Sequence, residues 1–90
     1  MAVVALKIKI LPETPETNLE ELKGKLQVAL EKAGAVRVQS IETEPIAFGL
    51  NALIITLAWP EQMETDTAEN ACKIEGVGNT EIIDYRRAFG

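Results

Sequence analysis

Residues 52–59 form the most apolar run of this chain, and both alternating sets of positions within the run are apolar apart from Thr56. A strand has this pattern when both of its faces are covered, which is typical of a central strand in a sheet. Pro60 follows directly and ends the run, because proline has no backbone N–H to donate to a neighbouring strand. We therefore expect a sheet built around residues 52–59, with Trp59 at the edge of the core.

The N-terminal segment has the alternation of a strand with one face in water. Every second residue from Val4 to Ile10 is aliphatic, whereas Lys7 and Lys9 occupy the other face. Pro12 then interrupts the pattern. This segment is a second candidate for the middle of the sheet, because its apolar face is continuous.

Apolar residues recur at helical spacing over residues 19–33, which predicts an amphipathic helix. Thr17 or Asn18 caps its start, since a glutamate stands three residues after each, as in a capping box. Gly34 supplies the stop. Gly24 inside the helix costs about 1 kcal/mol relative to alanine, and we expect packing to offset this cost.

The other elements are shorter. We expect one strand from Val36 to about Ile41 or Thr43, and a last strand over residues 80–87. Asp66 and Glu69 have the spacing of a capping box and predict a short helix after Pro60. The inner side of that helix would consist of Ala68, Ala71, Cys72 and Ile74.

The predicted order is strand, helix, strand, strand, helix, strand. With right-handed crossovers, the two βαβ halves interleave into one four-stranded antiparallel sheet with both helices on one face. This is the α+β, ferredoxin-like βαββαβ plait, in which the first and third strands lie centrally. Residues 1–90 are too few for more than one domain. A fold of this type hosts many activities, so function has to be argued from the site.

The sequence lacks most of the residues that enzymes use. It has no His, which excludes a histidine base, a His-dependent triad and a histidine metal ligand. Cys72 is the only cysteine, so neither an internal disulfide nor a pair of thiolate ligands can form. The turn at residues 12–15 has no glycine or lysine to hold a phosphate. The acidic run at residues 61–69 lacks the spacing of a calcium loop and is interpreted as a solvated turn and helix start. We expect no enzyme activity, no metal and no cofactor.

The net charge of -5 argues against a nucleic-acid-binding surface, because phosphate contacts need clustered Lys and Arg. Residues 2–11 are interrupted by Lys7 and Lys9 and contain no cleavage site, so they are neither a signal peptide nor a membrane span. One free cysteine fits a reducing compartment. We expect a cytoplasmic protein without direct contacts to nucleic acid or membrane.

The segment Pro45–Leu50 places apolar residues between two predicted strands, where such side chains are hard to bury. Pro45 disfavours helix at the residue before it and Gly49 supplies a flexible backbone, so we expect a turn or a bulged hairpin. The large apolar side chains of this turn are Ile46, Phe48 and Leu50. They either complete the core or bind a partner.

The end of the last strand, residues 85–90, contains Arg86, Arg87 and the aromatic Phe89. Strand alternation puts Arg86 and Arg87 on opposite faces, so at most one of them reaches a partner. We expect this end of the strand and the Pro45–Leu50 turn to reach neighbouring parts of the surface. The alternative is a pair of solvated charges on an edge strand.

Three segments resemble translation elongation factor 1-beta, most closely its short archaeal form. They are Asn18–Leu22 at the start of the first helix, Pro45–Leu50 before the third strand, and Ile74–Val77 before a final strand that begins Thr80–Ile82. The resemblance covers essentially the whole chain, with these segments in the right order. The Pro-Ile-x-Phe-Gly turn is the most specific of the three.

This resemblance implies a guanine-nucleotide exchange factor for elongation factor 1-alpha, the GTPase that delivers aminoacyl-tRNA to the ribosome. It implies that Phe48 docks in the GTPase and that a basic residue near the C-terminus reaches toward the Mg²⁺ and phosphate site. Motif position assigns the second role to Arg87, where eukaryotic members have Lys. The candidate partner-binding residues are then Pro45, Ile46, Phe48, Gly49, Leu50, Arg86 and Arg87.

Such a chain would be a monomer when free. The competing hypothesis is a small ferredoxin-like regulatory or assembly module, which would self-associate through the same apolar turn and bind a small effector.

Overall fold

The computed structural model describes residues 2–87 of the chain. Its strands and helices follow one another in the predicted order. The strands are β1 (Val3–Pro12), β2 (Arg37–Pro45), β3 (Asn51–Pro60) and β4 (Val77–Arg87). The helices are α1 (Leu19–Ala33) and α2 (Thr65–Ala71), and a short 3₁₀ turn, η1 (Ala47–Gly49), joins β2 to β3. Strands β2 and β4 are each longer than their sequence patterns predict.

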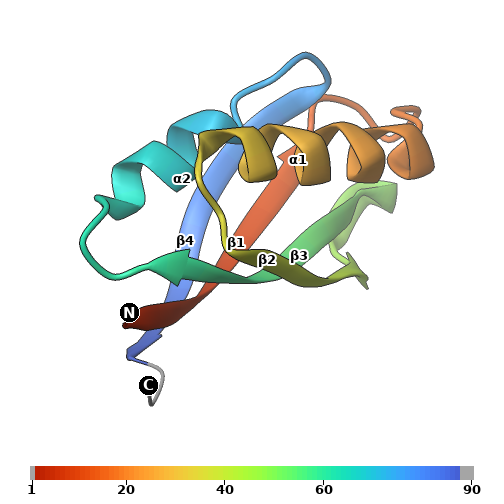
Figure 1. The fold of residues 1–90 in the computed structure, drawn as a ribbon. Helices are drawn as coiled ribbons and strands as arrows, with labels where there is room; N and C mark the ends of the chain where they lie inside the picture. The colour runs from red at the N-terminus through yellow and green to blue at the C-terminus, as the bar shows by residue number, and fades with distance from the viewer. Residues whose placement is uncertain (1, 88–90) are drawn as a thin grey trace.

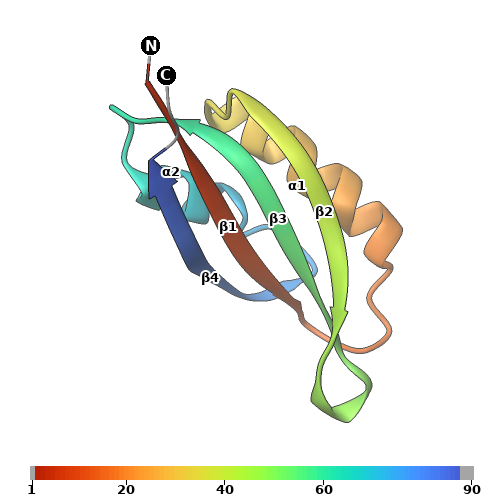
Figure 2. The same cartoon turned by 90° about the horizontal axis from the view of Figure 1, so that it is seen from below.

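The strands form one antiparallel sheet in the order β2-β3-β1-β4. Strands β1 and β3 are therefore central, and both helices lie against the same side of the sheet (Figure 1). This confirms the ferredoxin-like α+β plait. The turn between β2 and β3 projects beyond the rest of the sheet as a protruding hairpin (Figure 2).

The core consists of the helix-facing sides of the two central strands and the inner sides of the helices. Directly opposed pairs in β1 and β3, such as Leu6 with Leu57 and Ile8 with Ile55, are buried. Trp59 pairs with Val4 and is fully buried rather than at the core edge, and its Nε1–H donates to the Met63 carbonyl oxygen at 3.3 Å. The helices contribute Leu22, Leu26, Leu30, Ala68 and Cys72.

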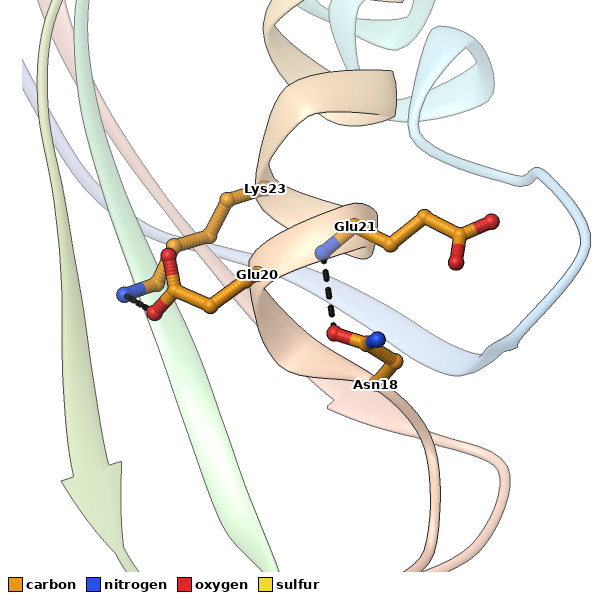
Figure 3. Close-up of polar contacts among 4 residues, drawn as sticks. All are labelled: Asn18, Glu20, Glu21 and Lys23. Carbon is orange, nitrogen blue, oxygen red and sulfur yellow. Dashed lines mark hydrogen bonds and ion pairs between the residues drawn. The ribbon is translucent and has the colours of Figure 1, made fainter.

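The N-cap of helix α1 is Asn18, one of the two caps that the sequence pattern offered. Asn18 Oδ1 accepts a hydrogen bond from the Glu21 backbone N–H at 3.1 Å (Figure 3). The Glu21 side chain does not complete the capping box, because it points away from Asn18 and forms an ion pair with Lys25 at 3.0 Å. A second ion pair joins Glu20 and Lys23, which lie about one helical turn apart, at 3.3 Å.

Two local expectations in the helices are wrong. Helix α2 starts at Thr65 with Glu64 as its N-cap and without a side-chain cap hydrogen bond, so the predicted Asp66–Glu69 capping box does not form. In α1, a Cβ added to Gly24 would meet no atom within 4 Å. Packing therefore does not offset the cost of this glycine, which lies on the outer face of the helix.

Candidate partner-binding site

The tip of the β2–β3 hairpin, Pro45–Leu50, divides its apolar side chains between the fold and the solvent. Ile46 and Leu50 are partly buried, and the Ile46 N–H donates to the Leu50 carbonyl oxygen at 2.9 Å, which closes the loop. Phe48 lies between them at the apex and is 94% exposed. The side chains of this turn were expected either to complete the core or to face outward, where they could bind a partner. Phe48 faces outward and contributes nothing to the core.

The backbone at the apex is held in the left-handed region. Phe48 has φ 62° and ψ 31°, and it is the only non-glycine residue with a positive φ among residues 2–87. Gly49 follows at φ 74°. Left-handed conformations are unfavourable for a bulky residue. Such strain is typically retained at binding sites, where the surrounding structure fixes it.

The second group of candidate residues, Arg86 and Arg87, lies at the last two described positions of β4. The register places Arg86 opposite Ala5 and Arg87 opposite Val4, so the two side chains point to opposite faces of the sheet, as predicted. Phe89, the aromatic noted after them, lies outside the described residues.

Each arginine has an acidic partner. Arg86 Nε lies 3.1 Å from Asp84 Oδ2, two positions earlier on the same strand. Arg87 Nη2 lies 3.0 Å from Glu61 Oε1, in the loop between β3 and α2. The sequence reading of Glu61 as part of a solvated turn missed this pair, because nothing in the pattern places residue 61 beside residue 87.

The fold separates the two groups of candidate residues. The tip follows the end of the hairpin where Pro45 pairs with Asn51, whereas Arg87 lies beside Val4, whose other neighbour is Trp59. Eight residue steps along β3 from Asn51 to Trp59 span about 26 Å at 3.3 Å per residue. The expectation that these groups reach neighbouring parts of the surface is therefore wrong. They lie toward opposite ends of a domain whose longest dimension is 41 Å.

The described residues offer little for covalent chemistry. Burial, with a smaller contribution from the Glu69 charge, raises the pKa of the Cys72 thiol to about 12, so this thiol is not a nucleophile near neutral pH. Within residues 2–87, no group of three acidic or cysteine side chains is arranged to hold a metal ion. No helix in the same range is long and apolar enough to cross a membrane. The candidate residues present exposed side chains at both ends, the aromatic ring of Phe48 at the tip and the guanidinium groups of Arg86 and Arg87 at the far end.

Comparisons with known proteins identify the family of this chain. Residues 5–87 match the family model of the EF-1 guanine nucleotide exchange domain. A relative from Methanosarcina barkeri named elongation factor 1-beta is 47% identical over 89 residues, which cover 97% of this chain and 99% of the relative. A relative of the same name from Metallosphaera sedula is 40% identical over 90 residues, or 97% of each chain. The chain belongs to the EF-1 guanine nucleotide exchange domain family and is similar to archaeal elongation factor 1-beta proteins along nearly its whole length.

Proposed function

We propose that this chain is a guanine-nucleotide exchange factor that promotes GDP release and GTP reloading on elongation factor 1-alpha during protein synthesis. The observation that carries the proposal is the exposed Phe48 on a strained tip, within a chain whose residues 5–87 match an exchange-domain family. The whole chain, residues 1–90, would act as one exchange domain in the cytoplasm, where elongation takes place.

Exchange by this route is a matter of protein binding and involves no covalent step. A GTPase holds its nucleotide through phosphate-binding amides and Mg²⁺, and a factor releases the nucleotide by binding the empty conformation more tightly. Bound GDP must then weaken the binding of the factor by the same ratio. A thousandfold faster release requires about 4 kcal/mol of differential stabilisation.

The tip and the arginines are suited to supply this free energy. Burying an exposed Phe side chain contributes about 2 to 3 kcal/mol, and Phe48 is available for burial because it makes no core contact. One charge-assisted contact from Arg87 to a phosphate contributes about 1.5 to 2 kcal/mol. Because the stretch of β3 between the two ends spans about 26 Å, we infer that Phe48 and Arg87 contact two separate parts of the GTPase.

The direct test is the release of fluorescent GDP from the cognate elongation factor 1-alpha, with and without this chain. We expect release to become faster in proportion to the factor concentration and then to saturate. No acceleration at micromolar factor would contradict the proposal.

Oligomeric state separates exchange from the assembly-module hypothesis. Sedimentation should show a monomer whose mass is independent of concentration and that gains mass only when the nucleotide-free GTPase is added. A dimer that has no effect on GDP release would favour a self-associating module.

A further inference from the structure

The ion pairs of Arg86 and Arg87 differ in what they connect. The partner of Arg86, Asp84, is on the same strand and moves with it. The partner of Arg87, Glu61, is 26 positions earlier in the sequence and belongs to the loop after β3. Only the second pair fixes an arginine relative to a different part of the fold, so only Arg87 is oriented by tertiary structure.

Glu61 is the anchored member of its pair. Its backbone N–H donates to the Ala2 carbonyl oxygen at 3.1 Å, and the loop that follows is held by the Met63 N–H bond to the Pro60 carbonyl oxygen. The Glu61 side chain is 29% exposed, whereas that of Arg87 is 73% exposed. The carboxylate therefore provides a fixed point, and the long arginine side chain is the group that it restrains.

The ion pair leaves most of the guanidinium available. The Glu61 carboxylate contacts Nη2 of Arg87, and a guanidinium carries five N–H donors in a planar fork. An exposed pair of this kind is weak and yields to a stronger anion. Glu61 thus restricts the orientation of Arg87 without preventing it from donating to a phosphate of a partner.

We propose that Glu61 is a positioning residue that orients Arg87 for contact with the phosphate and Mg²⁺ site of the GTPase. The inference rests on the proposed exchange function. Orientation before contact reduces the conformational entropy lost when the contact forms. Glu61 would therefore affect the maximal rate of GDP release more than the factor concentration at half-saturation, which depends mainly on the distant tip.

The matched pair of variants is Glu61→Gln, which removes the charge that holds Arg87, and Asp84→Asn, which does the same for Arg86. Glu61→Gln is expected to lower the maximal release rate about threefold, within the range that one exposed ion pair supplies. Asp84→Asn is expected to change that rate by less than about 1.5-fold, because it affects only the local pair. Equal effects of the two variants would overturn the proposal.

A double-mutant cycle tests whether Glu61 acts through Arg87. In an Arg87→Ala background, Glu61→Gln should have no further effect on GDP release, because there is no guanidinium left to orient. A threefold loss that persists in that background would show that Glu61 acts by another route and would overturn the proposal. So would an unchanged release rate in Glu61→Gln alone.

A measurement on the free factor separates this inference from the exchange function. The heteronuclear NOE of the Arg87 Nε–H should be higher in the wild type than in Glu61→Gln, while the value for Arg86 stays the same in both. An equal Arg87 value in the two proteins would overturn positioning even if the wild type accelerates GDP release. Failure of the wild type to accelerate release would instead count against the proposed function.

Discussion

The tip and the arginine end present their exposed side chains by different physical means. At the tip, the left-handed backbone of Phe48 and Gly49 projects an aromatic ring that is 94% exposed. At the other end, two exposed cations form ion pairs, Arg86 with Asp84 on its own strand and Arg87 with Glu61 from another part of the fold. Backbone conformation is insensitive to ionic strength, whereas exposed ion pairs are screened by salt. A contact made by the tip should therefore depend little on the salt concentration, whereas a contact made by the arginine end should weaken as the salt concentration rises.

Phe48→Ala should have the largest effect of any single substitution at either end. Loss of a central aromatic anchor costs about 2 kcal/mol or more of binding, so GDP release at subsaturating factor should fall by about 30-fold. The melting temperature should not change, because the ring contributes nothing to the core. A collapse of the melting temperature would show that Phe48 is structural and would remove the contrast between the two ends.

Arg87→Ala should reduce GDP release by about tenfold, the equivalent of one charge-assisted contact, and the loss should be greatest at high Mg²⁺. The reason is that a cation at the phosphate site competes with the metal ion. Arg86→Ala is the matched control, since its side chain points to the opposite face of the sheet. Release rates at several Mg²⁺ concentrations check this. Near-zero, Mg²⁺-independent effects of both variants would leave exchange resting on the tip alone.

Phe48→Asn should separate stability from binding at the tip. Asn tolerates the left-handed region better than Phe does, so the free energy of unfolding should rise by about 0.5 to 1 kcal/mol while GDP release falls about as far as in Phe48→Ala. Phe48→Ala is the control, because alanine keeps the unfavourable backbone conformation. Urea unfolding of both variants gives the difference. A lower stability for Phe48→Asn would mean that the apex is not strained.

Gly24→Ala on α1 provides a control remote from both ends. It should raise the free energy of unfolding by about 1 kcal/mol, since the added Cβ meets no neighbouring atom. GDP release should remain at the wild-type rate. If exchange also changed, the effects at the tip and at the arginine end could not be assigned to local contacts.

The order of elements and the central strands were predictable because apolar alternation reports burial directly. The apolar run 52–59 placed β3 in the middle of the sheet, although only one of its faces is covered by the helices and the face with Ile54, Thr56 and Ala58 is partly exposed. The spacing of glutamates left Thr17 and Asn18 as alternative caps, and the structure has Asn18 in this role. The Pro45–Leu50 turn was also recognisable, because the turn residues Pro45 and Gly49 stand among the large apolar residues Ile46, Phe48 and Leu50. The exposure of Phe48 was left open, because composition does not say which apolar side chain of a turn faces out.

The relation between the two ends was mispredicted, although the antiparallel directions of the strands determine it. In an antiparallel sheet the end of β4 lies beside the start of β1, as Arg87 beside Val4 shows, and the β2–β3 turn lies beyond the opposite ends of the strands. Strand direction alone contained this information. The Glu61–Arg87 pair could not be predicted in the same way, since it depends on the path of the loop after Pro60.

The central claim is that two separate ends of one small domain contact the GTPase. The most direct measurement is a double-mutant cycle of Phe48→Ala and Arg87→Ala in fluorescent GDP release from elongation factor 1-alpha. Sites this far apart should contribute independently, so the double variant should be slower by about the product of the single losses, about 300-fold. A double variant no slower than Phe48→Ala alone would show that Arg87 acts only through the tip contact and would contradict the account.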